Sequence, residues 1–275
     1  MSDESSGWGT ALAEKWTNYY PPCRVSASEL QIYSNALKEI RNKFRNERIK
    51  VLILGSTSEF RDWAHEENLD TTVVDFSLGY YQKISEQMKY KHAKSELINK
   101  RWQEMEFSEE FHIVVGDLVV GNVNEFELPD FLNRVRCSLI AGGVFVTKSF
   151  FSNSEYRKSS LDSILSDASQ YRLHGNVFSR YIFDIAMHCL NVEENTLSFS
   201  YMHQEIYRLY KLKLIDEDVF NLFDKLGWQD NMKFSFFMPS SKLWEDKLLS
   251  IFSDYQKAKS QDVYSDNFNV YTIYK

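Results

Sequence analysis

The segment KVLILGSTSEF, from Lys50 to Phe60, decides how the rest of the chain is interpreted. It begins with a short, continuous apolar run, which is typical of a β-strand covered on both faces. Gly55 follows the strand and permits a turn that a Cβ would obstruct, and Ser56, Thr57 and Ser58 can cap a helix that begins there. Free backbone N–H groups and a helix dipole at such a junction favour a carboxylate- or hydroxyl-bearing ligand.

The same loop disfavours two common nucleotide sites. It has one glycine, whereas dinucleotide-binding loops carry three, of which the second and third let the backbone close on a pyrophosphate. It also lacks the lysine of a Walker phosphate-binding loop. Binding of a nicotinamide dinucleotide or of ATP is therefore disfavoured.

Strands and helices alternate over the following hundred residues. The expected strands are TTVVDF, HIVVGD and VFVTKSFF, and the expected helices are EFRDWAHEE, SLGYYQKISEQM and LPDFLNRVRCSLI. The turn AGG, which contains Gly142 and Gly143, is expected to lead into the last of these strands. This alternation predicts a parallel sheet with right-handed crossovers.

The two ends of the chain follow other patterns. A helix is expected over residues 27–44, capped by Ser26 or Ser28. After Phe151 we expect helices over 156–172, 179–190 and 216–228, and late strands over 232–238 and 268–275. More than half of the Tyr and Phe residues lie in this last part. They form either ordinary core or an apolar pocket for a ring-bearing substrate.

Composition limits the function classes. The chain has 275 residues, 43% of them hydrophobic, which suffices for one large α/β domain. The net charge of −7 disfavours nucleic acid as the partner. The acidic, polar start and the lack of a long apolar run predict no secretory signal and no membrane span. The three scattered cysteines suit a reducing compartment, so we expect a soluble, cytoplasmic protein.

Asp75 extends the predicted ligand site to a second strand. It lies 20 residues after Gly55, at the end of the strand TTVVDF. This spacing places its carboxylate beside the same crevice, where it can accept hydrogen bonds from two ribose hydroxyls. The alternative is a residue at a helix N-terminus that binds no ligand.

Five segments in this order carry a family resemblance: VLILGSTSEF, TTVVDFS, RWQEMEF, FHIVVGDLVVGNV and LIAGGVFVTKSF. Together they resemble class I S-adenosylmethionine-dependent methyltransferases. More narrowly, they resemble a bacterial subgroup whose first loop reads Leu-Gly-x-Thr-Pro-Glu, with Ser58 here in place of the proline. The resemblance runs from about Trp16 to Ile185 and includes an N-terminal element matched by Trp16, Tyr20 and Arg24.

The resemblance implies a fold and a division of the chain. The fold is a Rossmann-like, seven-stranded, mostly parallel sheet with an antiparallel last strand and a helical lid. The expected parts are an N-terminal helical cap (1–45), a cofactor-binding core (46–152), a lid insertion (153–213) and a C-terminal segment that completes the sheet (214–275).

The resemblance also implies a cofactor, S-adenosyl-L-methionine, with S-adenosyl-L-homocysteine as product. Gly55 to Glu59 would surround the methionine part, Asp75 would hold the ribose, and Trp102 would stack beside the adenine. The implied cofactor-binding residues are Gly55, Ser56, Thr57, Glu59, Asp75, Phe76, Trp102, Asp117 and Leu118. One departure is Arg101, which stands where the family has an aspartate that accepts a hydrogen bond from the adenine amino group.

The candidate general bases and the candidate residues for binding the methyl acceptor are chosen by their position in the predicted fold. Asp117 and His174 are candidate general bases, although His174 taken singly is better explained as a structural or surface histidine. The acceptor is expected between the N-terminal element and residues 153–213. The candidate substrate residues are Tyr19, Tyr20, Arg24, Asn122, Phe151, Arg180 and Tyr181, where Asn122 and its neighbour Asn124 can instead be simple turn formers.

The expected function is methyl transfer to a small molecule, such as a metabolite or a natural-product-like intermediate. Alignment of the nucleophile with the methyl group and the leaving sulfur supplies most of the rate enhancement in such a reaction. Two alternatives stay open: a non-catalytic scaffold subunit with a degenerate pocket, and an enzyme that uses the cofactor as a positive charge without transferring its methyl group. The oligomeric state is left open.

Overall fold

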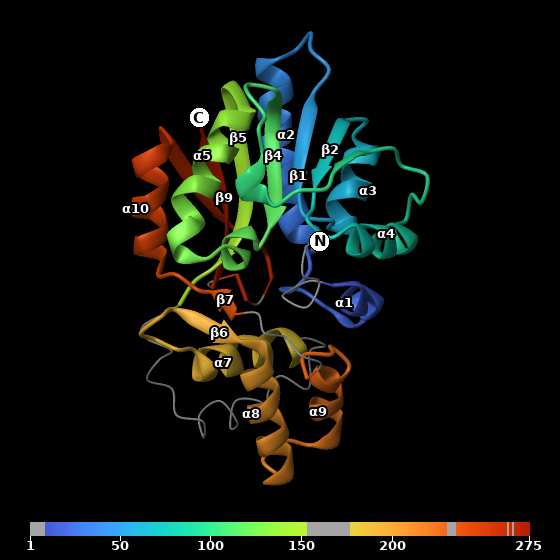
Figure 1. Cartoon of the computed structure of the whole chain (residues 1–275), viewed down its shortest axis with the longest axis vertical. Coiled ribbons are helices and arrows are strands. Elements are labelled where there is room, and N and C mark those ends of the chain that lie inside the picture. Colours follow the sequence, from blue (N-terminus) through green and yellow to red (C-terminus); the bar gives the residue numbers. More distant parts are fainter. Residues whose placement is uncertain (1–8, 153–176, 230–234, 263, 266) are drawn as a thin grey trace.

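The computed structural model describes residues 9–152, 177–229, 235–262, 264–265 and 267–275. Its main sheet has seven strands in the order β3-β2-β1-β4-β5-β9-β8 (Figure 1). The strands are β1 (Lys50–Leu54), β2 (Asp70–Val74), β3 (Glu96–Ile98), β4 (Phe111–Asp117), β5 (Leu139–Phe150), β8 (Asp254–Lys259) and β9 (Phe268–Tyr274). β9 pairs antiparallel with both β5 and β8, and the pairs from β3 to β5 are parallel. This confirms the predicted fold class.

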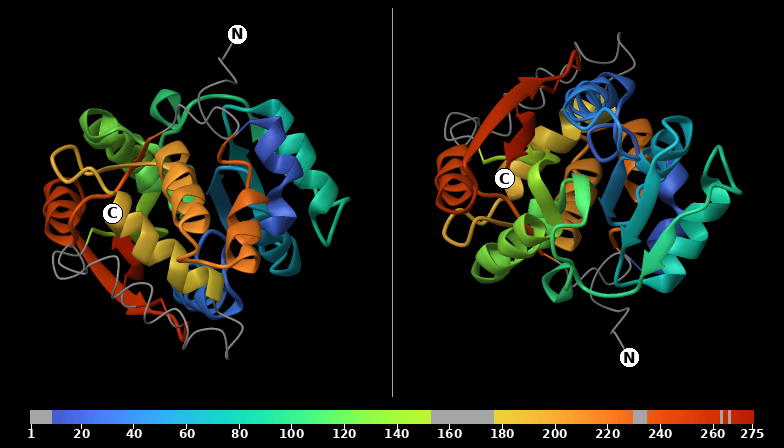
Figure 2. Two further views of the ribbon diagram at one scale, coloured as in Figure 1. Left: turned by 90° about the horizontal axis from the view of Figure 1, so that it is seen from below. Right: turned by 90° about the horizontal axis from the view of Figure 1, so that it is seen from above.

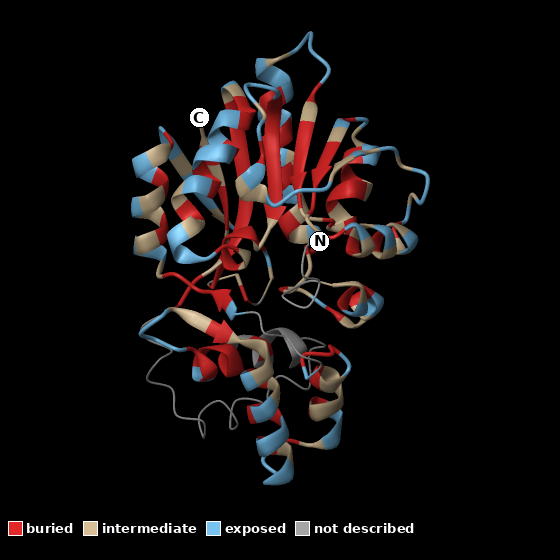
Figure 3. Ribbon diagram, viewed as in Figure 1, coloured by how far each residue is buried: buried red, intermediate tan, exposed pale blue. Residues whose placement is uncertain are grey.

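Helices cover both faces of this sheet. α2 (Ala27–Lys43) and α3 (Ser58–Glu66) pack on one face, and α5 (Leu128–Ser138) and α10 (Ser241–Ile251) pack on the other. The central strands alternate between these two apolar clusters, so β1 sends Val51 and Ile53 to one side and Leu52 and Leu54 to the other. Buried residues consequently run through the strands of the sheet (Figure 3).

A helical lid lies across the carboxyl ends of the strands (Figure 2). It contains α7 (Val177–Cys189), β6 (Thr196–Ser198), α8 (Phe199–Lys211), α9 (Glu217–Asp224) and β7 (Ser235–Phe237). One apolar cluster joins these elements to α1 (Thr10–Glu14), the 3-10 helix η2 (Trp16–Asn18) and α4 (Leu78–Gln87). None of the helices in the described ranges has the length and apolarity that a membrane span requires.

One expectation for the sheet was wrong, and one late strand that was expected lies outside the main sheet. The AGG segment does not precede the strand, because β5 already begins at Leu139 and contains it as an irregularity. Gly142 has φ +77°, and its carbonyl oxygen accepts a hydrogen bond from Lys43 Nζ at 3.0 Å. The late strand around Ser235–Phe237 pairs with β6 in a separate two-stranded sheet, so that β8 takes the edge position of the main sheet.

Most of the helices were predicted, and their caps can be assigned. The helix expected over 156–172 lies outside the described residues. α2 begins with a capping box, in which Ser26 Oγ accepts from Glu29 N at 3.0 Å and Glu29 Oε2 accepts from Ser26 N at 2.9 Å. The choice between Ser26 and Ser28 is thereby settled, since Ser28 Oγ instead accepts from Gln261 N.

Substitution Ser26→Ala tests this cap. It removes the bond to Glu29 N and the 2.6 Å bond that Ser26 Oγ donates to Asp262. We expect the free energy of unfolding in urea to fall by about 1–2 kcal/mol. The control Ser250→Ala, at an exposed position on α10, should change it by less than about 0.5 kcal/mol. Equal stability of the two variants would contradict the assigned cap.

Candidate active site

A cavity of about 690 Å³ lies between the carboxyl end of the sheet and the lid. Its sheet side is lined mainly by loops that follow β1, β2 and β4, and this side carries the polar groups. Its lid side is lined mainly by aromatic and aliphatic side chains. The crevice beyond the carboxyl ends of parallel strands is the usual ligand site of an open α/β sheet.

The loop after β1 is shaped around Gly55. Its φ of +84° favours glycine, and a Cβ at this position would lie 3.5 Å from the ring of Trp102. Gly55 N and Trp102 Nε1 both donate to the carbonyl oxygen of Val74, each at 2.9 Å. The indole is thus fixed beside the glycine turn, and the turn leaves room for a ligand to approach the backbone.

Asp75 is held in place at the end of β2. Its carboxylate accepts from Ser56 Oγ at 2.5 Å and from Ser77 N at 2.9 Å. Burial raises the pKa of Asp75, against the lowering effect of these hydrogen bonds. A carboxylate has about four acceptor positions, and Asp75 lines the cavity, so a position remains for a hydroxyl donor of a ligand.

Arg101 is neutralised by a carboxylate that the sequence did not predict. Arg101 Nη2 donates to both oxygens of Glu127, at 2.7 and 3.0 Å. Glu127 Oε2 also accepts from Gln103 Nε2 at 3.2 Å and from Asn124 Nδ2 at 3.3 Å. All four side chains line the cavity next to Trp102. Glu127 belongs to a separate 3-10 helix, η5 (Glu125–Glu127), and nothing in its local sequence marks it.

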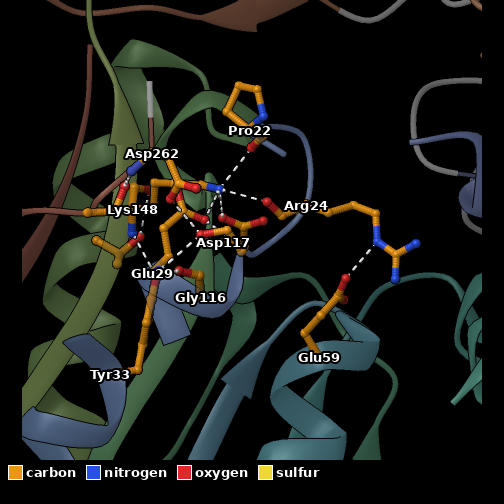
Figure 4. A network of polar contacts seen from close by, with 12 residues as sticks. Pro22, Arg24, Glu29, Tyr33, Glu59, Gly116, Asp117, Lys148 and Asp262 are labelled. Carbon is orange, nitrogen blue, oxygen red and sulfur yellow. Dashed lines mark hydrogen bonds and ion pairs between the residues drawn. The ribbon is translucent and has the colours of Figure 1, made fainter. Parts of the chain in front are cut away.

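A buried ion cluster lies where β4 and β5 end (Figure 4). Lys148 Nζ contacts Asp117 Oδ1 at 3.1 Å and Glu29 Oε2 at 2.9 Å. It also donates to the carbonyl oxygens of Pro22 at 2.8 Å and Arg24 at 3.1 Å. The side chains of Lys148 and Glu29 are 1% and 0% exposed, so these charges have little access to water. The signal available in the sequence was a single lysine inside the apolar run VFVTKSFF.

One ammonium faces two carboxylates in this cluster, which leaves an excess negative charge. The pKa of Asp117 is raised to about 7, chiefly by burial; Lys148 opposes this shift and Glu29 adds to it. Burial lowers the pKa of Lys148, but the two carboxylates outweigh burial and raise it. Asp117 lines the cavity, so the excess negative charge lies at the cavity wall.

The N-terminal element packs against the β1 loop. Trp16 Nε1 donates to Ser58 Oγ at 3.3 Å, and Arg24 Nε donates to Glu59 Oε1 at 2.6 Å (Figure 4). Glu59 therefore faces Arg24, and neither residue is part of the cavity lining. Tyr20 is 52% exposed and also lies outside the lining.

The structure brings most of the predicted site residues together. Of the predicted residues, the cavity lining includes Gly55, Ser56, Thr57, Asp75, Phe76, Trp102, Asp117, Leu118, Tyr19 and Asn122. Phe151 directly follows β5 and is buried in the apolar cluster on the face covered by α5 and α10, with its ring centroid 5.6 Å from that of Tyr271. His174 lies outside the described residues. Arg180 and Tyr181 lie in α7, but the structure does not describe their side chains.

Comparison with solved structures supports this fold. No protein-family model and no curated sequence matches the chain. The CurJ carbon methyltransferase superposes with a TM-score of 0.54 and 12% identity, over 91% of this chain and 56% of that chain. The PH0226 protein of Pyrococcus horikoshii OT3 gives 0.51 and 15%, over 95% and 98%. A Rhodobacter sphaeroides protein, assigned provisionally to the Zn-dependent alcohol dehydrogenases, gives 0.52 and 14%, over 96% and 97%. At these identities the likeness shows the fold, which is Rossmann-like and shared with methyltransferases.

The ion cluster predicts a pH-dependent stability. Because the pKa of Asp117 is raised from 3.8 to about 7, the unfolded chain loses this proton first as the pH rises. The carboxylate therefore lowers folding stability progressively between about pH 4 and pH 7, and the loss is complete above pH 7. We expect Asp117→Asn to raise the free energy of unfolding at pH 8 by about 1–3 kcal/mol, and by less at pH 5.

Urea unfolding of both proteins across this pH range measures the effect. Asp70→Asn, which changes an exposed carboxylate at the start of β2, is the matched control and should show no such trend. A lower stability of Asp117→Asn at pH 8 would contradict the raised pKa.

Proposed function

We propose that this protein transfers a methyl group from S-adenosyl-L-methionine to a small-molecule acceptor. The observation that carries the proposal is the convergence of three groups in one cavity. The glycine turn at Gly55, the carboxylate of Asp75 and the indole of Trp102 stand at neighbouring strand ends. They suit, respectively, an amino-acid moiety, a ribose and a purine ring.

The donor set fits this cofactor. Gly55, Ser56 and Thr57 would surround the methionine part, and Asp117 with Leu118 would line its amino end. The buried Asp117 Oδ1 has a salt-bridge contact with Lys148 but no hydrogen-bond partner among the described residues. A cationic ligand at this position would offset the excess negative charge of the ion cluster.

The adenine end of the proposed site depends on Glu127. The aspartate expected next to Trp102 is replaced by Arg101, which cannot accept a hydrogen bond from an amino group. Glu127 supplies a carboxylate at the same end of the cavity, and its Oε1 accepts only from Arg101 among the described residues. We assign the contact with the adenine amino group to Glu127, oriented by Arg101.

When bound, the sulfonium supplies an activated methyl carbon, which bonds to the acceptor atom as the carbon–sulfur bond breaks. The residues of this chain then have two tasks. The lid excludes water from the cavity, and Asp117 accepts the proton that a neutral O–H or N–H acceptor gives up.

Calorimetric titration with S-adenosyl-L-methionine, and separately with S-adenosyl-L-homocysteine, tests the proposal. We expect micromolar binding, weakened about 10- to 100-fold in Asp75→Ala because hydrogen bonding of the ligand to a charged acceptor is lost. Asp70→Ala is the control and should bind as the wild type does. Millimolar or absent binding of both ligands by the wild type would exclude the proposal and favour the non-catalytic scaffold.

Glu127 offers a separate test of the adenine contact. We expect Glu127→Gln to discriminate less between S-adenosyl-L-homocysteine and its inosine analogue, which has an oxygen in place of the adenine amino group. The wild type should prefer the adenine form by about tenfold, and the variant by about threefold or less. An unchanged preference in the variant would contradict the role of Glu127.

Formation of S-adenosyl-L-homocysteine during turnover separates methyl transfer from the alternative in which the cofactor serves only as a positive charge.

A further inference from the structure

Seven aromatic rings from the N-terminal element, the lid and the strands β5 and β9 form a continuous series around the cavity, and we call this series the aromatic wall. Its members are Trp16, Tyr19, Trp228, Phe199, Phe236, Phe150 and Phe268, all of which line the cavity. In this order, successive ring centroids are 5.5, 6.5, 5.0, 6.0, 6.5 and 4.2 Å apart. Rings at these distances contact one another, so the wall is one apolar surface.

The aromatic wall reaches the sheet side of the cavity at Gly121. This glycine lies in η4 (Val119–Asn122), a 3-10 helix that directly follows Asp117 and Leu118. A Cβ on Gly121 would lie 1.9 Å from the ring of Phe236, so the ring rests against the backbone itself. Leu118, the residue after Asp117, also packs against the apolar cluster that contains Phe236, and Asp117 lines the same cavity.

The charges around the cavity are predominantly negative. Asp75, Asp117 and Glu127 are its acidic residues in the described part of the chain. Arg101 is the one cationic side chain among the described lining residues, and Glu127 neutralises it. Cys23, beside the wall, stays a neutral thiol because burial raises its pKa to about 12. Among the described residues, an anion in this cavity would lose its hydration without gaining an unpaired cation.

We propose that the aromatic wall is the acceptor site and that the acceptor is a ring-bearing molecule without negative charge. This inference rests on the proposed function, because it places the acceptor beside the cofactor site. An apolar ring would stack on the wall, and a nucleophilic O–H or N–H at its edge would lie near Asp117. Aromatic faces also attract cations, so an amine acceptor is compatible with the same site.

Three naphthalene derivatives of similar size and different charge test the inference. They are 2-naphthalenemethanol, 2-naphthylmethylammonium and 2-naphthoate, titrated calorimetrically at pH 7.5 with saturating S-adenosyl-L-homocysteine. We expect the alcohol and the ammonium to bind at least about tenfold more tightly than the carboxylate. In Asp117→Asn the difference between the alcohol and the carboxylate should narrow to about threefold or less.

Variants of the aromatic wall locate the binding. Phe236→Ala should weaken binding of the alcohol by about fivefold or more and leave the affinity for S-adenosyl-L-homocysteine unchanged. Phe126→Ala, at a ring that is 80% exposed and outside the cavity lining, is the matched control. Equal binding of the alcohol and the carboxylate, lack of binding by both the alcohol and the ammonium, or an unaffected Phe236→Ala variant would each overturn the inference.

The two proposals can fail separately. If S-adenosyl-L-homocysteine does not bind, the proposed function fails, and the same titrations in cofactor-free protein still test the charge preference of the wall. If S-adenosyl-L-homocysteine binds and the probes show no charge preference, the cofactor site stands and the assignment of the acceptor class falls.

Discussion

The architecture of the site depends on one buried ammonium group. Lys148 can remain charged inside the protein because two carboxylates and two carbonyl oxygens surround it. These partners come from α2, from the end of β4 and from the N-terminal segment. The cluster therefore requires these three parts to meet at one point, and the same N-terminal segment supplies Trp16 and Tyr19 to the cavity lining. From there Tyr19 bonds to the lid, through Leu226 O at 3.0 Å and Trp228 Nε1 at 2.9 Å.

The sequence predicts well those features that are written in local patterns. The strands around β1, β2 and β4 show as short apolar runs, and the residues that follow them, such as Gly55 and Asp75, reach the cavity by topology alone. The partners of Lys148 could not be predicted, because Glu29 lies 119 residues away and helical periodicity says nothing about its neighbours. In the sequence, Arg101 in place of the expected aspartate reads as the loss of a ligand contact. Only the structure shows that Arg101 pairs with Glu127, which lies 26 residues further along the chain. The irregular start of β5 and the position of the polar strand β8 depend on pairing between distant segments, which has no local signature.

The cavity has two chemically different sides. The sheet side presents carboxylates, hydroxyls and backbone groups, each held by a short hydrogen bond to a neighbour, as for Asp75 and Ser56. The aromatic wall presents rings from six separate segments of the chain, of which three belong to the lid. Rigid polar groups and a broad apolar surface meet at Asp117, which lies at the boundary and carries the excess charge. With such a division, the polar side can recognise the proposed cofactor while the apolar side recognises the proposed acceptor.

The position of β9 has a consequence for how the protein is made. β9 is inserted between β5 and β8, and it pairs Val144 with Tyr274 across 130 residues of chain. During synthesis the β5 edge of the sheet stays open until β9 has emerged from the ribosome, and Phe268 joins the aromatic wall only then. Until that moment β5 exposes an unpaired, hydrophobic edge, which is the kind of surface that chaperones bind. The same strand thus completes the main sheet and adds Phe268 to the cavity lining.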